Sequence, residues 1–202
     1  ISGYLAEFSR KFNKKAPVYV VPNGADLEKY QISNIKYQNG RKDKTIITVS
    51  RLVRKNGIDI LIKAFKLLHS DYYLLLSSNY YLLNSKLLII GDGPLKESLK
   101  LQVKSLKLED KVKFLGELPP EEVPDYLAQA DIFVRPSRSE GLGTAFLEAM
   151  AAGLAVIGTP VGGIPDFLVD PSISSGQATG LFCEPENPED LAQKISVLLK
   201  DE

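Results

Sequence analysis

Residues 131–158 read DIFVRPSRSEGLGTAFLEAMAAGLAVIG. This stretch begins and ends with short apolar runs, and between them residues 143–152 have the composition of a helix that Gly153 would end. Apolar runs that do not alternate with polar residues are typical of strands buried on both faces, as in a parallel sheet. The stretch therefore predicts a strand–helix–strand unit, with strands at 131–134 and 154–157.

The same rhythm continues outward in both directions. The further strands that we expect are 45–50, 87–90, 112–115 and 181–183. The further helices that we expect are 2–13, 57–69, 95–106, 120–130, 163–169 and 187–200. Strands that alternate with helices predict an α/β domain with a doubly wound parallel sheet. Before this rhythm begins, we expect a short strand at 18–21 and a polar loop at 27–44.

One segment interrupts the alternation. Residues 70–86 read SDYYLLLSSNYYLLNSK and contain Tyr-Tyr-Leu-Leu twice. We interpret this segment as an insertion. It is either a hairpin or extra strand with its aromatic side chains on the domain surface, or a patch that contacts a partner.

The bulk composition limits the class of protein. The chain has 202 residues, of which 44% are hydrophobic and 25% charged, and this is ordinary for a globular domain. Its 25 basic and 25 acidic residues give a net charge of zero, which does not indicate binding to nucleic acid or to an acidic membrane surface. No apolar run approaches the roughly 20 residues of a membrane span, and we expect no signal peptide.

Single residues add further limits. Cys183 is the only cysteine and His69 the only histidine, which excludes a Cys/His metal cluster and leaves little material for a nucleophile–histidine catalytic system. One cysteine suggests a reducing compartment, so we expect a cytoplasmic protein. His69 ends a helical pattern, where we expect a surface or boundary histidine. Because the chain begins with Ile1 and its single methionine is Met150, we expect a fragment of a longer protein.

Unusual residues follow four of the expected strands. They are Ser50-Arg51, GDGP at 91–94, RPSRSEG at 135–141 and GTPVGG at 158–163. Ligands of open parallel sheets bind beyond the carboxyl ends of the strands, which is where these loops meet. The composition of each loop alone is explained by the residues that turns prefer, but the convergence of the four loops on one edge predicts a ligand crevice.

Two glutamates stand in the stretch quoted first. Glu140 lies among glycines, and Glu148 lies in an apolar helical run. Gly141 and Gly143 place the start of the helix near Thr144, where unpaired amides and the helix dipole form a phosphate site. Glu148 would lie roughly 6 Å along the helix axis from Thr144. Both carboxylates would then flank one ligand and address its hydroxyl groups, which a nucleoside diphosphate sugar carries at both ends.

Each glutamate also has a purely structural interpretation. Glu148 would then be a buried carboxylate paired with a structural arginine, for which Arg135 and Arg138 are the nearby candidates. Glu140 would be an exposed acid of a surface loop. Both interpretations stay open at the level of sequence.

These residues resemble a known family. SEGLGTAFLEAMAAGLAVIGTPVGG at 139–163 resembles the Glu-x7-Glu region of retaining GT-B glycosyltransferases, specifically family 4, the glycosyl transferases group 1. Further similar segments are VVPNGAD at 20–26, VSRLVRKNGIDILIKAF at 49–65, LLIIGDGP at 87–94, VKFLGELPPEEVPDYLAQADIFVRPS at 112–137 and ATGLFCEPENPEDLAQKI at 178–195. The resemblance covers almost the whole chain outside 27–44 and 70–86, and its order and spacing make it specific.

The resemblance implies a two-domain enzyme with facing Rossmann-like domains, of which this chain is the C-terminal, donor-binding half of the GT-B fold. Residues 1–16 would be a linker helix from the preceding domain, and residues 17–202 the nucleotide-sugar-binding domain. The acceptor site would lie mostly in the missing N-terminal domain, and any peripheral membrane association would run through that domain. We therefore expect the isolated chain to fold but not to transfer sugar.

The resemblance also implies roles for single residues. As catalytic residues, Glu140 would contact the transferred sugar and Arg51 would stabilise the leaving diphosphate. Glu148 would bind ribose hydroxyls, and amides of the glycine loop would hold sugar and phosphate. The expected donor-binding residues are Lys55, Asn56, Gly91, Gly93, Gly141, Leu142, Gly143, Thr144 and Glu148. Positive side chains and a helix terminus replace a cation in this family, so we expect neither a metal nor a cofactor.

One position departs from the pattern of the family. A lysine usually stands directly before the glycine of the first loop, and here that position is Asn56. Either Lys55, one residue earlier, reaches the phosphate with its long side chain, or the phosphate has one positive partner less. A third interpretation is that Lys55 is only an exposed loop charge.

We predict a glycosyltransferase that moves a hexose-type sugar from a nucleoside diphosphate to a hydroxyl acceptor with retention, in polysaccharide or glycoconjugate biosynthesis. The nucleotide stays open among UDP, GDP and ADP, as do the sugar and the acceptor. One alternative is a catalytically inactive nucleotide-sugar-binding subunit, which only Asn56 supports. Another is a dinucleotide-dependent oxidoreductase, but GDGPLK at 91–96 lacks the third glycine of G-x-G-x-x-G and does not follow the first strand.

Overall fold

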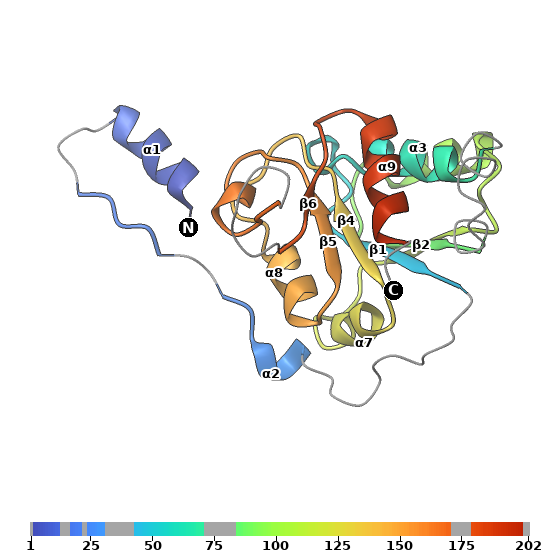
Figure 1. The fold of residues 1–202 in the computed structure, drawn as a ribbon, viewed down its shortest axis with the longest axis horizontal. Coiled ribbons are helices and arrows are strands. Elements are labelled where there is room, and N and C mark those ends of the chain that lie inside the picture. Colours follow the sequence, from blue (N-terminus) through green and yellow to red (C-terminus); the bar gives the residue numbers. More distant parts are fainter. Residues whose placement is uncertain are drawn as a thin grey trace.

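The structure of this chain, a computed structural model, describes residues 2–12, 17–21, 24–30, 43–70, 84–170 and 179–199. A six-stranded parallel sheet runs through it in the order β3-β2-β1-β4-β5-β6 (Figure 1). The strands are β1 (Thr45–Val49), β2 (Lys86–Ile90), β3 (Val112–Gly116), β4 (Ile132–Arg135), β5 (Ala155–Gly158) and β6 (Leu181–Phe182). The strand order reverses between β1 and β4, so the predicted doubly wound sheet is confirmed and its switch point lies there.

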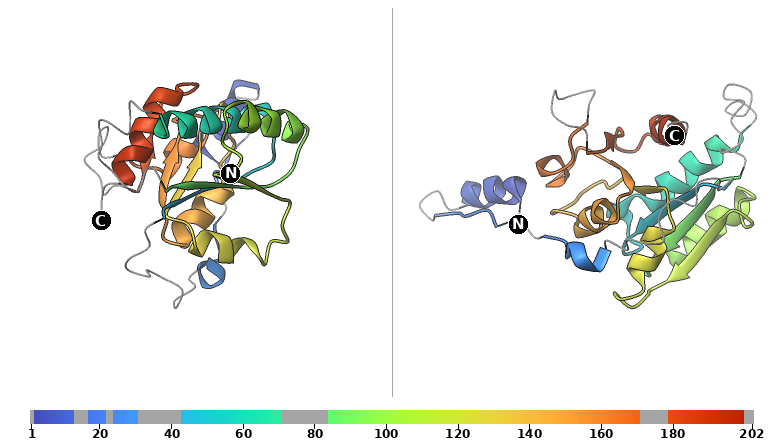
Figure 2. Two further views of the ribbon diagram at one scale, coloured as in Figure 1. Left: turned by 90° about the vertical axis from the view of Figure 1, so that its right-hand side faces the viewer. Right: turned by 60° about the horizontal axis from the view of Figure 1, so that its bottom comes forward.

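Helices cover both faces of this sheet (Figure 2). They are α1 (Gly3–Phe12), α2 (Leu27–Tyr30), α3 (Ile58–Leu68), α6 (Lys96–Ser105), α7 (Val123–Ala128), α8 (Thr144–Ala151) and α9 (Pro188–Leu198), with 3-10 turns η1 (Arg54–Asn56) and η2 (Ile164–Asp166). One face is covered by α3, α6 and α9, and the other by α7 and α8, with α2 packed beside them.

Strand β1 shows why the expected strands are apolar throughout. Ile46 is fully buried in the cluster beneath α3 and α9, whereas its neighbour Ile47 is fully buried in the cluster beneath α8. Successive side chains of a strand point to opposite faces, and both faces of this sheet carry helices. An alternating polar pattern would therefore have placed polar groups in one of the two cores.

Helix α3 brings together the two loops at the switch point. Its buried residues include Ile58, Leu61, Phe65 and Leu68, which follow one another at intervals of three or four residues. The residue before it, Gly57, has a left-handed backbone with φ 71°. A Cβ at this position would collide with the carbonyl oxygen of Pro136, so glycine lets the loop after β1 pack directly on the loop after β4.

The N-terminal expectations were only partly correct. The strand expected at 18–21 is wrong, because residues 17–21 form no strand and are mostly exposed. Their β-forming composition is a local preference, and within the described residues no strand of the sheet lies beside them to complete it. The polar loop expected at 27–44 contains the short helix α2 at its start, and residues 31–42 lie outside the described residues.

Helix α1 extends away from the sheet (Figures 1 and 2) and contacts the rest of the structure through its first residues. The amide of Gly3 donates to Oδ2 of Asp166 at 2.7 Å, and Ser2 is buried. Tyr4 and Phe8 are half exposed, and Phe12 is largely exposed. The assignment of residues 1–16 to a preceding domain stays a prediction.

Two further expectations concern the ends of helices. The helix expected at 163–169 is only the turn η2, because the backbone leaves the helical conformation at Phe167, where φ is −133°. The last helix, expected at 187–200, is α9, and Asn187 caps its start, since its Oδ1 accepts from the amide of Asp190 at 3.0 Å. His69 lies half-buried at the end of α3, as expected, with Nδ1 2.9 Å from the carbonyl oxygen of Phe65.

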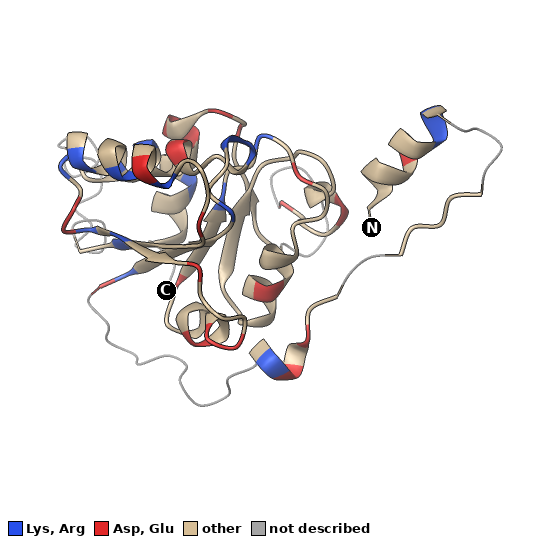
Figure 3. Cartoon of the chain, turned by 180° about the vertical axis from the view of Figure 1, so that it is seen from behind, with Lys and Arg blue, Asp and Glu red and all other residues tan. Residues whose placement is uncertain are grey.

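Other features of the chain concern its surface. Residues 71–83 of the expected insertion lie outside the described residues. Acidic and basic residues are interspersed over the helices and loops (Figure 3), in agreement with their equal numbers. Among the helices of the described part, none has the length and apolarity needed to cross a membrane.

Candidate functional site

A cleft of about 750 Å³ lies at the carboxyl ends of β1 and β4, the switch point of the sheet. Two loops form its walls. The first wall is the loop 50–57 after β1, and the second wall is the segment 135–144 from the end of β4 to the start of α8. The lining residues are Leu5, Arg51, Val53, Lys55, Asn56, Arg135, Glu140, Gly141, Leu142, Gly143 and Thr144. Most residues expected at the site are thus brought together.

Gly91 and Gly93 do not line this cleft. They belong to the loop after β2, and a Cβ on either would collide with the backbone of Ser50 or of Leu52. The Leu52 amide donates to the carbonyl of Asp92 at 2.8 Å, which ties this loop to the first wall. The two glycines therefore support the first wall from behind, and their expected contact with a donor stays a prediction.

Asn56 has a structural task in the first wall. Its side chain is buried, and Nδ2 donates to the carbonyl oxygen of Arg51 at 2.7 Å, which closes the loop on itself. Arg51 and Lys55 are exposed. Among the described residues, neither of these two side chains has a hydrogen-bond or ion-pair partner. The first wall therefore presents two unpaired cations to the cleft.

Arg135 of the second wall is buried and paired. Its Nη2 donates to Oε2 of Glu140, and the exposed fractions of the two side chains are 7% and 12%. The guanidinium carbon lies 4.9 Å from the ring centroid of Phe146, and Nη1 donates to the carbonyl of Val49 at 3.4 Å. Burial lowers the pKa of Arg135, while the charge of Glu140 opposes this. Glu140 is therefore a positioned carboxylate, and the interpretation as an exposed loop acid is wrong.

The glycine loop leads into α8 as expected. The amide of Gly141 donates to Oε1 of Glu140 at 2.9 Å, and Gly143 adopts φ 81° directly before Thr144 begins the helix. A Cβ at Gly143 would come within 2.9 Å of Arg135 Nη2, so the glycine leaves room for the guanidinium. Among the described residues, the amides of Leu142 and Gly143 have no acceptor. These amides and the helix N-terminus offer an anion site.

Glu148 lies half-buried on α8, and it is not part of the cleft lining. It neighbours the hydroxyl of Tyr30 from α2. Burial and the neighbouring Glu148 charge raise the pKa of Tyr30 to about 12. The expected structural partners of Glu148 are both engaged elsewhere, since Arg135 pairs with Glu140 and Arg138 pairs with Asp59. The interpretation of Glu148 as half of a buried ion pair with an arginine is therefore wrong.

Sequence reasoning missed three contributors to the site. The sequence suggests Arg135 only as a partner of Glu148, although a cation that ends an apolar strand before a proline is itself a signal. Leu5 reaches the cleft from α1, far away in the sequence, and no sequence pattern points to this contact. Tyr30 stands in the stretch 27–44, for which the sequence predicts a loop.

Comparison with known proteins gives a family. Residues 31–202 match the family Glycosyl transferases group 1. The gpi3 subunit of phosphatidylinositol N-acetylglucosaminyltransferase from Schizosaccharomyces pombe is 32% identical over 185 residues, which are 91% of this chain and 36% of that protein.

Solved structures agree with this assignment. Sucrose-phosphate synthase from Thermosynechococcus elongatus is 26% identical with a TM-score of 0.80, over 99% of this chain and 48% of that one. HepE of Anabaena, solved in complex with UDP and glucose, is 25% identical with a TM-score of 0.69, over 91% of this chain and 47% of that one. The chain spans about half the length or less of these proteins. It belongs to the glycosyl transferases group 1 family, and its fold is one Rossmann-like half of a GT-B glycosyltransferase.

Proposed function

We propose that this chain is the donor-binding half of a retaining glycosyltransferase of family 4, which transfers a hexose-type sugar from a nucleoside diphosphate to a hydroxyl acceptor. One observation carries the proposal. A single cleft at the switch point places two unpaired cations, Arg51 and Lys55, opposite the N-terminus of α8. Cations and free amides that face each other across a cleft suit a ligand with two phosphate groups.

The leaving diphosphate would bind between the two walls. Arg51 and Lys55 neutralise it from one side, and the amides of Leu142 and Gly143 donate to it from the other. The same groups stabilise the negative charge that grows on the diphosphate when the sugar leaves. In this proposal the site needs no metal ion, because side chains and the helix terminus supply the positive charge.

The sugar would lie beside Glu140. Hydrogen bonds from Arg135 and from the Gly141 amide fix this carboxylate before any ligand arrives. A carboxylate has about four acceptor positions, so capacity remains for a sugar hydroxyl. Its negative charge also stabilises positive charge that develops at the anomeric carbon. Glu140 thus orients the sugar, whereas Arg51 assists the leaving group.

The ribose would be bound by Glu148. This residue lies on the second turn of α8, next to the hydroxyl of Tyr30. Its carboxylate has acceptor positions for ribose hydroxyls. Ribose binding by Glu148 and phosphate binding at the start of α8 would use two turns of one helix.

The whole protein would contain more than this chain. We propose that the acceptor site, and any peripheral association with a membrane, belong to a facing domain, and that the protein is cytoplasmic. The S. pombe relative bears a name that refers to phosphatidylinositol, which agrees with a lipid-linked acceptor in that protein. The isolated chain would fold without transferring sugar. Robust transfer by the chain alone would contradict this division of labour.

A thermal-shift panel tests donor binding. Purified chain is heated with UDP, GDP, ADP and the corresponding nucleotide sugars, with EDTA or with Mg²⁺, and with NADH as the oxidoreductase probe. A ligand at one hundred times its Kd adds about 2.7 kcal/mol of stability, and we expect this from one nucleotide with EDTA present. Arg51→Ala/Lys55→Ala should lose the shift, and the exposed control pair Lys63→Ala/Lys104→Ala should keep it.

The proposal would be contradicted if NADH were the only ligand that stabilised the chain, or if none of the nucleotides stabilised it. The inactive-subunit alternative requires a separate test. Both functions predict donor binding, but only the transferase predicts turnover by the full-length protein. Asn56 no longer favours inactivity, because its side chain closes the first wall.

A further inference from the structure

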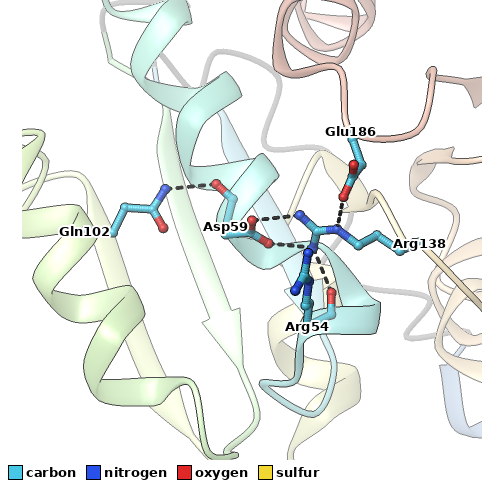
Figure 4. A network of polar contacts seen from close by, with 5 residues as sticks. All are labelled: Arg54, Asp59, Gln102, Arg138 and Glu186. Atoms are coloured by element: carbon cyan, nitrogen blue, oxygen red, sulfur yellow. Dashed lines mark hydrogen bonds and ion pairs between the residues drawn. The ribbon is translucent and has the colours of Figure 1, made fainter.

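Arg138 stands in the second wall, two residues before Glu140, but it does not line the cleft. Its side chain is 18% exposed. The guanidinium reaches three other parts of the chain (Figure 4), and its contacts are independent of the Arg135–Glu140 pair. The role of this residue is thus separate from direct ligand contact.

The first contact of Arg138 is with the start of α3. Nη1 and Nη2 donate to Oδ1 and Oδ2 of Asp59, both at 2.8 Å. Two parallel charge-assisted bonds fix the plane of the guanidinium as well as its position. Asp59 lies in the first turn of α3, and its own carbonyl accepts from Nε2 of Gln102 on α6 at 2.9 Å. The anchor for Arg138 is therefore part of two packed helices.

The second contact is with the first wall. Nη1 donates to the carbonyl of Arg54 at 2.7 Å, and the main-chain amide of Arg138 donates to the carbonyl of Lys55 at 2.7 Å. Both carbonyls belong to η1, the turn that separates Arg51 from Gly57. One residue of the second wall thus holds this turn with its side chain and with its backbone.

The third contact is with the loop between β6 and α9. Nε donates to Oε1 of Glu186, a half-exposed residue whose φ is 58°. A positive φ is uncommon for a residue other than glycine. Arg138 therefore joins the second wall to the first wall, to α3 and to this C-terminal loop.

We propose that Arg138 is a positioning residue that sets the spacing between the two walls of the cleft. The benefit of this spacing rests on the proposed function, because Arg51 and Lys55 and the α8 terminus must contact the same diphosphate. A planar group that donates in four directions is suited to this task. Lysine has the same charge but lacks the fork.

Calorimetric titration with UDP, GDP and ADP tests the proposal, at a temperature where every variant is folded. Arg138→Met should weaken binding of the nucleotide that binds the wild type by roughly tenfold or more, as expected for misplaced binding groups. Arg138→Lys should not restore it. A core control, Ile195→Val in α9, should lower the melting temperature but bind as the wild type does. Wild-type affinity in Arg138→Met, or full rescue by Arg138→Lys, would overturn the proposal.

Hydrogen exchange provides a second measurement that needs no nucleotide. Amides of residues 51–57 and 139–144 should exchange faster in Arg138→Met, whereas those of β1 should not. If Arg138→Met does not fold, Glu186→Gln keeps the Asp59 contact and should show a smaller change in the same two segments. Unchanged exchange in both segments would overturn the positioning role. If the wild type binds no nucleotide, the proposed function fails, and exchange still decides the role of Arg138.

Discussion

The two walls of the cleft hold their charged groups in opposite ways. Arg51 and Lys55 of the first wall are exposed and have no partner among the described residues. Arg135 and Glu140 of the second wall are buried and paired with each other. The first wall thus leaves its charges free, whereas the second wall fixes its charges before any ligand binds. Such preorganised polar groups cost little reorganisation when the reaction occurs.

Removal of the buried cation should have the largest effect. Arg135→Met leaves the Glu140 carboxylate buried without its ionic partner, and breaking such a pair costs about 3–5 kcal/mol. We expect urea denaturation to show a loss of this size in the free energy of unfolding. Arg135→Met/Glu140→Gln should recover part of it, because neither charge is then buried. Wild-type stability in the single variant would show that the pair does not define the second wall.

The first wall should separate affinity from stability. Lys55→Ala should leave stability within about 0.5 kcal/mol of the wild type. It should weaken nucleoside diphosphate binding by about tenfold at low salt, and by less as salt screens the charge. Asn56→Ala loses the bond to the Arg51 carbonyl and should cost about 0.5–1.5 kcal/mol of stability. Its loss of affinity should be smaller than that of Lys55→Ala. Titration and urea denaturation of both variants check these expectations, and a larger loss of affinity in Asn56→Ala than in Lys55→Ala would contradict them.

Glu148 tests whether the ligand extends from the cleft along α8. Glu148→Gln keeps an acceptor for the Tyr30 hydroxyl but weakens charge-assisted bonds to ribose, which contribute about 1.5–3 kcal/mol each. Nucleotide affinity should therefore fall several-fold, with little change in melting temperature. Unchanged affinity together with a large loss of stability would instead make Glu148 a structural residue.

Tyr30 should give the smallest effect, and the effect should depend on pH only in alkali. Its pKa is raised to about 12 from an ordinary value of 10.0, first by burial and then by Glu148. The stability that comes from the neutral hydroxyl is therefore complete below pH 10 and is lost as the pH rises to about 12. Tyr30→Phe should flatten the fall in melting temperature over this range. An identical alkaline profile in both proteins would contradict the Tyr30–Glu148 contact.

The sequence predicted most of the sheet because burial on both faces leaves a clear pattern. Ile46 and Ile47 lie on opposite faces and are both fully buried, so β1 reads as a continuous apolar run. Residues 17–21 carry a similar local composition but are mostly exposed and form no strand. Local preference cannot supply a neighbouring strand, and this is why that prediction was wrong.

For the site, the sequence predicted which loops meet better than it predicted which side chains contact each other. Arg51, Lys55 and Glu140 share one cleft because the ends of parallel strands meet at one edge of the sheet. The choice of Glu140 instead of Glu148 as the partner of Arg135 depends on side-chain geometry, which residue spacing does not contain. The same is true of Asn56, whose side chain turns back onto its own loop.

The central claim is that free cations and a free helix terminus bind one diphosphate between them. An NMR titration of ¹⁵N-labelled chain with UDP, GDP and ADP tests this most directly, since each amide reports its own environment. For the nucleotide that binds, we predict the largest shifts at Leu142, Gly143 and Thr144, together with shifts at Arg51 and Lys55. Saturable binding that leaves the amides of residues 142–144 unshifted, or no saturable shift with any of the three, would contradict the claim.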